Sequence, residues 1–570
     1  MAKNRPPRPA AAPPRPAPAT ARWHPAILLA LAAVLWMGWF SHEIYDSDFW
    51  WHLKTGQYIV EKHALPVPDP FAFTTATAVS AYPGEPLTRH FNLTHEWLAQ
   101  VAFYLVWRVA GFGGVVLFRA FLLSAFCGLV GLVAYRRCLS FYWSLAAAFA
   151  AATIAMPFAL DRPYLFTFLF LAATIAILEF KRWLWLLPPL FLVWANSHGG
   201  FFLGWVVLGA YGAEALLSRR RAALCWSVAA VLISGLNPNG FRIPLVLMYY
   251  RGSYLTSRLQ EWGRPRWWVV NEFTVLLFGA AVVLLWARRR VRLADWLLFA
   301  AFAAAALTAQ RNMILIGLLA PILIASYFPW RPSLPPVAPF AAALVLMAGG
   351  IAASAGSFFQ LRAAEWKYPA GAADFLLRHH VSGPIFNTYE YGGYLIWRLW
   401  PAERVFIDGR SLSESVFQDY GRILYNHDES GGKTAQQLLD QYGIQTIVMN
   451  TFEYGEGLVY LMAPALADPQ QTEWKLVYSD AAAIVLMRRP PPGVQPLDSL
   501  RILNHMEAEC ELHLEHEPQL ARCARSMAQV FTQVGDAARA RRWLGIYLEH
   551  PHAADAVAEA AYQRLLNSGR

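Results

Sequence analysis

Charged residues are scarce in this chain: they make up 15% of its 570 residues, against 56% hydrophobic residues. Soluble domains carry about 25% charged residues, and a soluble core could not bury this much apolar surface. The apolar residues also come in blocks of roughly 17–25 uncharged residues, the length that crosses a bilayer as a helix. The shortage of charge therefore excludes an ordinary soluble protein and predicts a polytopic α-helical membrane protein.

Nucleotide-binding signatures are missing as well. No phosphate loop, dinucleotide fingerprint or nucleophile elbow occurs beside the strand and helix that each requires. This absence argues against an ATP-driven pump.

Cysteine is rare, and three of the five lie in or beside apolar blocks as small core residues, namely Cys127, Cys138 and Cys225.

Basic clusters between the apolar blocks set the predicted topology. Clusters such as Arg136-Arg137 and Arg288–Arg290 are typical of cytoplasmic loops, so the net charge of +10 does not indicate nucleic acid as a partner. Residues 1–24, rich in Pro, Ala and Arg, predict a disordered cytoplasmic N-terminus. Within a transmembrane domain of residues 25–355 we predict about eleven spans: 25–41, 114–135, 140–159, 164–180, 183–196, 200–217, 222–236, 270–287, 293–309, 311–328 and 336–355.

The apolar stretch Glu96–Ala110 admits two interpretations. As a span, it would send the later basic clusters to the wrong side; as a helix flat on the outer surface, it leaves them all in the cytoplasm. Its length, amphipathic pattern and Arg108 favour the interfacial helix. The protein then lies in a bacterial inner membrane with its N-terminus in the cytoplasm and its C-terminus on the outer side. Residues 42–95 become a first outer loop, in which Asp48–Lys62 predicts a second interfacial helix.

Polar residues gather on this outer side, which predicts a working site there. Asp46 and Asp48 directly follow the first span and suit a general base or a ligand pair for Mg²⁺ or Mn²⁺; capping the helix that starts at Asp48 is the alternative. Arg162 and Arg311 stand at outer span ends, where either a phosphate partner or interfacial snorkelling explains them. His198, followed by two glycines, is either a ligand contact or a satisfied helix-end histidine.

Residues 365–490 alternate helix-like and strand-like stretches and predict a small extracytoplasmic α/β domain. Its expected elements are a helix at 369–379 and strands at 384–386, 404–407, 446–449 and 483–487. Asp408 and Arg410 follow one of these strands, where either a ligand site or a structural salt bridge is expected.

Residues 497–570 predict a helical tail with a tetratricopeptide-like hairpin, a kind of element that binds partners or caps a neighbouring domain. Cys510 and Cys523 lie symmetrically about a turn in this tail, so they can face each other across a hairpin. In an oxidising periplasm they would form a disulfide.

The motif Asp46-Ser47-Asp48, the segment that starts at His95-Glu96-Trp97, and Arg119 at the second span resemble the C-type glycosyltransferase superfamily. Members transfer a sugar from a polyprenyl-phosphate carrier on the outer membrane face. The resemblance implies that fold, with Asp46 or Asp48 as catalytic base or metal ligand and outer-face arginines on the lipid phosphate. Our candidate residues for substrate or phosphate binding are His52, His95, Glu96, Arg162, His198, Arg311, Asp408 and Arg410.

The favoured function is therefore a membrane glycosyltransferase that uses a polyprenyl-phosphate-linked sugar, in contact with membrane lipid and with an envelope protein bound through the tail. A non-catalytic assembly or scaffold protein of the envelope is one alternative. A transporter or flippase of a lipid-linked glycan is another; it predicts internal hydropathy repeats and ionisable groups near the middle of the membrane, and the sequence has neither.

Overall fold

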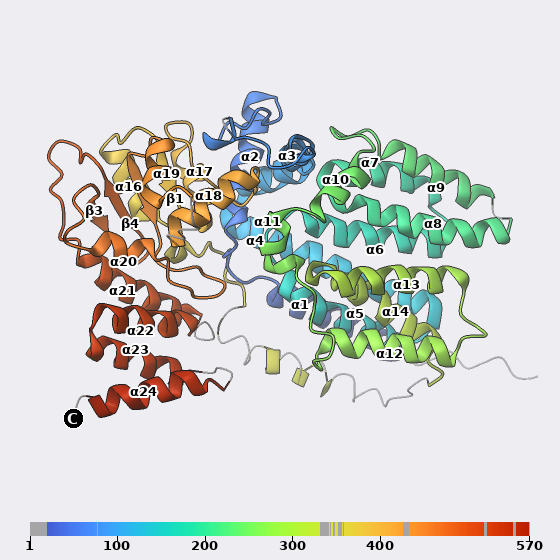
Figure 1. Cartoon of the computed structure of the whole chain (residues 1–570). Helices are drawn as coiled ribbons and strands as arrows, with labels where there is room; N and C mark the ends of the chain where they lie inside the picture. Colours follow the sequence, from blue (N-terminus) through green and yellow to red (C-terminus); the bar gives the residue numbers. More distant parts are fainter. Residues whose placement is uncertain are drawn as a thin grey trace, which may run out of the picture.

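A computed structural model describes residues 20–330 except 77 and 220, and residues 341–568 except 343, 346–347, 351–355, 357, 426–431, 518–520 and 551–553. A bundle of roughly parallel helices forms the right half of Figure 1. An α/β domain lies at one end of this bundle, and the C-terminal helices α21 to α24 stack beneath that domain. The molecule thus has one helical part and one mixed part, which meet end-on.

The bundle is built from apolar helices. The described residues contain four helical stretches long and apolar enough to cross a membrane and six shorter apolar ones, which indicates a multi-pass membrane protein. Each of these ten stretches contains all or most of one predicted span, although Glu85–Cys138 also includes the segment Glu96–Ala110. The eleventh predicted span, 336–355, lies mostly outside the described residues. The bundle helices are α1 Thr20–Trp39, α4 Trp97–Cys138, α5 Phe141–Ala155, α6 Tyr164–Phe180, α7 Leu187–Ser197, α8 Phe202–Leu217, α9 Arg221–Ile233, α12 Glu272–Trp286, α13 Leu293–Thr308 and α14 Ile314–Tyr327.

Ion pairs hold the helix ends together at the end of the bundle that carries the basic loops. Arg137, at the end of α4, donates to Asp295 on α13 at 3.1 Å. Arg292 donates to Glu179 at the end of α6 at 2.5 Å, and Tyr327 at the end of α14 also bonds Asp295. The predicted alternation of basic and polar loops therefore agrees with the geometry of the bundle.

The first outer loop contains α2 Asp48–Lys62 and α3 Glu85–Thr94. Residues Phe49–Gly56 are buried, because α2 packs between the first half of α4 and helix α17, Tyr389–Leu399, of the α/β domain. Trp50, for example, meets Tyr394 edge-on at 4.8 Å. The amphipathic pattern of α2 therefore serves contact with protein, and how this helix lies against a membrane stays a prediction.

A backbone break divides α4. Gly111 has φ 62° and ψ −161°, a conformation that glycine tolerates and a helix does not. It separates the stretch Glu96–Ala110 from the second span at the boundary that the sequence predicts. How the first half of α4 lies against a membrane stays a prediction.

Within the described residues, four strands form one mixed sheet in the order β1-β2-β4-β3, with β1 parallel to β2 and the other pairs antiparallel. The strands are β1 Ile385–Asn387, β2 Thr446–Met449, β3 Lys475–Ser479 and β4 Ile484–Met487. The helices beside them are α16 Ala370–Arg378, α17, α18 Glu414–Tyr425, α19 Ala435–Gln441 and α20 Met462–Ala467.

The prediction of a strand at 404–407 is wrong, because this segment does not belong to the sheet. The sequence did not predict β3. Val405 instead pairs with Ala72 in an isolated parallel bridge, and its amide donates to the carbonyl of Phe71 at 3.0 Å. The apolar run is buried as expected, but its backbone partners belong to the first outer loop. This pairing fastens the α/β domain to that loop.

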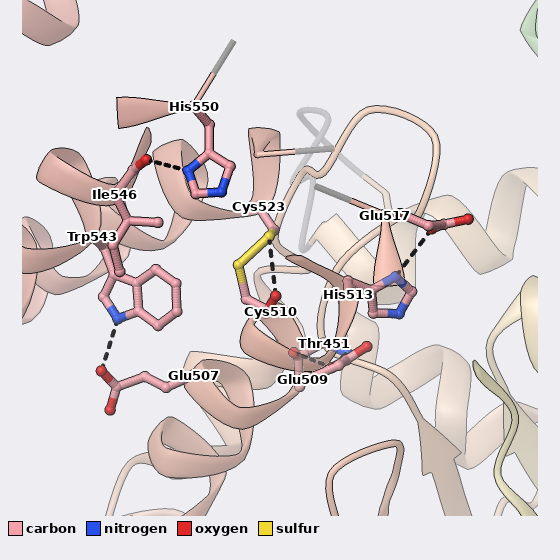
Figure 2. Close-up of a disulfide and its surroundings, with 10 residues drawn as sticks. All are labelled: Thr451, Glu507, Glu509, Cys510, His513, Glu517, Cys523, Trp543, Ile546 and His550. Carbon is pink, nitrogen blue, oxygen red and sulfur yellow. Dashed lines mark hydrogen bonds and ion pairs between the residues drawn. A yellow bond between two sulfur atoms is a disulfide. The ribbon is translucent and has the colours of Figure 1, made fainter. Parts of the chain in front are cut away.

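The tail consists of α21 Arg501–His516, α22 Arg522–Val534, α23 Ala537–Glu549 and α24 Ala556–Ser568. A disulfide joins Cys510 to Cys523, whose Cα atoms lie 5.9 Å apart, and so ties α21 to the start of α22 (Figure 2). Glu509 on α21 accepts a hydrogen bond from Thr451 of the α/β domain at 2.6 Å (Figure 2). The tail is thereby attached to the domain above it.

Candidate functional site

A cavity of about 880 Å³ lies where the bundle, the first outer loop and the α/β domain meet. Its apolar wall comes from bundle helices, with Phe126, Ile154, Leu171 and Leu318 from α4, α5, α6 and α14. Its polar wall contains eight of the ten candidate residues named from sequence: Asp48, His52, His95, Glu96, Arg162, His198, Arg311 and Arg410. Asp46 and Asp408 lie next to this wall and bond its arginines.

The two aspartates of the first loop share one guanidinium. Arg162 donates to both carboxylate oxygens of Asp46, through Nε and through Nη2, the latter at 2.7 Å. Its Nη1 lies 3.0 Å from Asp48 Oδ2. Asp46 also accepts the backbone N–H of Asp48 at 3.2 Å, so it helps to cap α2. Asp48 faces the cavity, and its Oδ1 accepts from the indole N–H of Trp51 at 3.1 Å.

The pKa values of these two aspartates move in opposite directions. Burial raises the pKa of Asp48 to about 6, because the single contact with Arg162 offsets the desolvation only in part. Burial alone would also raise the pKa of Asp46, but the charge and paired hydrogen bonds of Arg162 hold it below its usual range. Asp48 is therefore the aspartate suited to accept a proton near neutral pH.

A fully buried ion pair supports this arrangement from behind. Arg119 on α4 donates to Asp161, and both side chains are fully buried. Arg119 also donates to the backbone carbonyls of Phe40, at 3.0 Å, and His42. These bonds fix the end of α1 to the residue before Arg162. Arg119 is part of the family resemblance in the sequence, but its contact with Asp161, 42 positions further along the chain, could not be predicted from it.

A second cluster is centred on Glu96, which occupies the N-cap position of α4 next to the cavity. Its carboxylate lies 3.0 Å from His95 Nε2, 3.7 Å from His198 Nε2 and 3.6 Å from His52 Nδ1. Burial lowers the pKa of His52 to about 4 and that of His198 to about 3. One ligand atom each from His95, Glu96 and His198 lies within 4.8 Å of the others, so this group can hold a metal ion.

Arg311 stands at the start of α14 against two residues that sequence reasoning did not select. Its guanidinium bonds Glu261 at 3.1 Å and lies over the ring of Trp262 at 4.6 Å. Glu261 also approaches Arg162 at 3.9 Å. Glu261 therefore links the two arginines that the sequence proposes for phosphate, and only its position in an outer loop could have suggested this.

The α/β domain reaches the site through the turn after the run Val405–Ile407. A Cβ on Gly409 would lie 1.8 Å from Asp48 Oδ1, so a side chain here would displace the Asp48 carboxylate. Arg410 bonds Asp408 at 2.7 Å and Asp69 of the outer loop at 2.6 Å, and its side chain is 2% exposed. The guanidinium of Arg410 is thus used to join loop and domain.

Comparison with known proteins supports the fold. No family model matches the chain, and no curated protein sequence matches it. Among solved structures, the chain is similar to the archaeal oligosaccharyltransferase AglB from Archaeoglobus fulgidus, determined in complex with an inhibitory peptide and a dolichol-phosphate. The TM-score is 0.50 at 10% identity, over 96% of this chain and 86% of that one. The chain therefore has a fold like that of the C-type glycosyltransferases, and the predicted resemblance is confirmed for the fold.

Proposed function

We propose that the chain is a membrane glycosyltransferase that moves a sugar from a polyprenyl-phosphate carrier to an acceptor at the outer face of a bacterial inner membrane. The cavity is the observation that carries this proposal. It joins an apolar wall between bundle helices, suited to an isoprenoid chain, to a wall of acids and bases suited to the head group. The fold shared with AglB, solved with a dolichol-phosphate, supports a lipid-phosphate donor.

The proposed step is an inverting displacement at the anomeric carbon. The acceptor oxygen forms a bond to this carbon, its proton passes to the carboxylate of Asp48, and the lipid phosphate leaves with the electrons of the broken C–O bond. Protonation removes the negative charge that Asp48 presents to Arg162 at 3.0 Å. Arg162 then has more positive charge to offer the phosphate, beside Arg311 on the same wall. Asp46 acts through Arg162, which it holds from behind.

A divalent metal, Mg²⁺ or Mn²⁺, was expected at Asp46 and Asp48. Their carboxylates fit this role poorly, because Arg162 already occupies both oxygens of Asp46 and one of Asp48. Glu96 with His95 and His198 is the donor set on the cavity wall that fits an ion. A bound ion there would supply positive charge for the lipid phosphate.

The remaining parts have supporting roles in this proposal. The basic helix ends face the cytoplasm, and the α/β domain covers the cavity from outside. The tail, which resembles a tetratricopeptide hairpin at Gly535, where φ is 85°, offers a surface for an envelope partner.

The test uses Asp48→Asn in cells whose own copy is deleted, with surface glycans and lipid-linked sugars profiled by mass spectrometry. We expect loss of one surface glycan and accumulation of its lipid-linked donor at normal protein abundance. Asp374→Asn, an exposed aspartate outside the cavity, is the matched control and should restore the glycan. Normal glycans from Asp48→Asn would reject catalysis and favour the scaffold alternative.

A further inference from the structure

Negative charge exceeds positive charge around the cavity. The described residues that line it include five carboxylates and three guanidinium groups, namely Asp48, Glu85, Glu96, Glu261 and Glu272 against Arg162, Arg311 and Arg410. Each of the three arginines is already paired with at least one carboxylate. Any anion that enters this cavity would therefore gain from a further positive charge.

We propose that His95, Glu96 and His198 bind a divalent transition-metal ion of the zinc class. Ligand atoms about 2.0–2.2 Å from a tetrahedral ion lie roughly 3.3–3.6 Å from one another. The observed separations from Glu96 Oε1, 3.0 Å to His95 Nε2 and 3.7 Å to His198 Nε2, lie on either side of this range. The ligand nitrogens of His95 and His198 lie within 4.8 Å of each other, so a shift of up to about one ångström would complete the coordination.

The surroundings of the two histidines orient them for this role. His95 Nδ1 donates to the carbonyl of Phe91 at 2.7 Å, which turns Nε2 toward Glu96, so Nε2 is the nitrogen that an ion would take in place of its proton. The imidazole also stacks on the ring of Phe91 at 4.1 Å. His95 is thus held as a ligand before any ion arrives.

His198 requires a change of tautomer. Its Nδ1 accepts the backbone N–H of Gly200 at 3.0 Å, which puts the ring proton on Nε2 toward Glu96. The hydroxyl oxygen of Thr167 lies 2.8 Å from the same Nδ1 and can accept a hydrogen bond from it once Nδ1 carries the proton. Binding an ion at Nε2 therefore moves the proton to Nδ1, with Thr167 as its partner and at the expense of the bond from Gly200.

The donor set also selects the kind of ion. Two imidazoles and one carboxylate suit zinc and its neighbours, whereas Mg²⁺ prefers oxygen ligands alone. Three protein ligands that also line a cavity leave a coordination position for a substrate oxygen, as in catalytic zinc sites. The proposed function suggests a donor phosphate oxygen for that position, and this last step alone rests on it.

The test measures metal binding directly on the purified full chain in lipid nanodiscs. After treatment with a chelator and titration with zinc, we expect about one ion per chain by elemental analysis, undisturbed by excess Mg²⁺. The double variant His95→Ala/His198→Ala should lose this ion. Glu96→Gln should lower the affinity for zinc while keeping a side chain of the same size at position 96. His90→Ala removes a histidine of α3 that does not line the cavity and should bind zinc as the wild type does. Thr167→Val should weaken zinc about 10–100-fold, as loss of such outer partners does.

Equal zinc in the wild type and in a folded His95→Ala/His198→Ala variant would overturn the proposal, as would displacement of zinc by equimolar Mg²⁺. Melting curves identify the variants that fold. If the double variant does not fold, unchanged zinc affinity in Glu96→Gln would overturn the proposal instead. The result is independent of glycosyl transfer, because Asp48→Asn should keep its zinc. Zinc binding without any transferase activity would reject the proposed function and leave the metal site standing.

Discussion

The two aspartates of the first outer loop should have opposite effects on stability when each is changed to asparagine. Folding raises the pKa of Asp48 from 3.8 to about 6, so the folded protein disfavours its ionised form. At 1.36 kcal/mol per pKa unit, this shift costs about 3 kcal/mol at neutral pH. Asp48→Asn removes the charge and should stabilise the folded protein by up to that amount.

The pH dependence gives this prediction its sign. Because the folded pKa of Asp48 is the higher one, the wild type loses stability as pH rises from about 4 to about 6, and the loss is constant above that. The gain from Asp48→Asn should therefore be absent near pH 4 and complete above pH 6. Asp46 behaves in the opposite way, since its folded pKa is depressed. Its contribution is present above its unfolded pKa and is lost as pH falls, so Asp46→Asn should destabilise at neutral pH.

Melting temperatures of the purified variants in detergent, measured from about pH 4 to about pH 8, test the pair. The two residues are two positions apart and share Arg162, so each is the other's control. A lower melting temperature for Asp48→Asn at neutral pH would refute the electrostatic reasoning, and so would equal shifts of the same sign for both variants.

Three further predictions follow from the same contacts. The rate of transfer should fall about tenfold per pH unit below pH 6, where Asp48 becomes protonated. Trp51→Phe should move this fall in rate to higher pH, because it removes a hydrogen bond to the ionised form of Asp48. A pH–rate profile checks both. Gly409→Ala should abolish transfer while leaving the melting temperature near that of the wild type, because its Cβ would displace the Asp48 carboxylate; glycan profiles together with melting curves test this. Asp69→Ala should destabilise by about 3 kcal/mol, since it leaves Arg410 buried with only one of its two carboxylates, and the double change with Arg410→Met should recover part of the loss in melting experiments.

The sequence predicted the parts of the fold that follow from long apolar periodicity. Ten helical stretches appear where hydropathy and basic clusters place spans, because lipid permits few alternatives to an uninterrupted helix. The pattern of α2 could not reveal its protein neighbours, since an amphipathic helix packs its apolar face equally well on lipid or on protein. The strand prediction failed for Val405–Ile407, whose β-prone run forms its backbone bonds with the outer loop rather than with the sheet.

The candidate site was partly visible in the same way. Unusual polar residues at outer span ends selected eight side chains of the cavity wall, because charges at such positions are costly without a purpose. Sequence could not tell which partner each residue meets. The paired bonds that tie Asp46 to Arg162, the link of Glu261 to Arg311 and the approach of Gly409 to Asp48 all join segments far apart in the chain.

The most direct measurement takes the lipid fraction that accumulates in Asp48→Asn cells and incubates it with the purified wild-type chain in nanodiscs. The account predicts that the wild type cleaves the sugar from its lipid phosphate when a membrane extract supplies acceptor, and that purified Asp48→Asn, equally folded, does not. A lipid-linked sugar that stays intact with the folded wild-type protein, or one that both proteins cleave equally, would contradict the account.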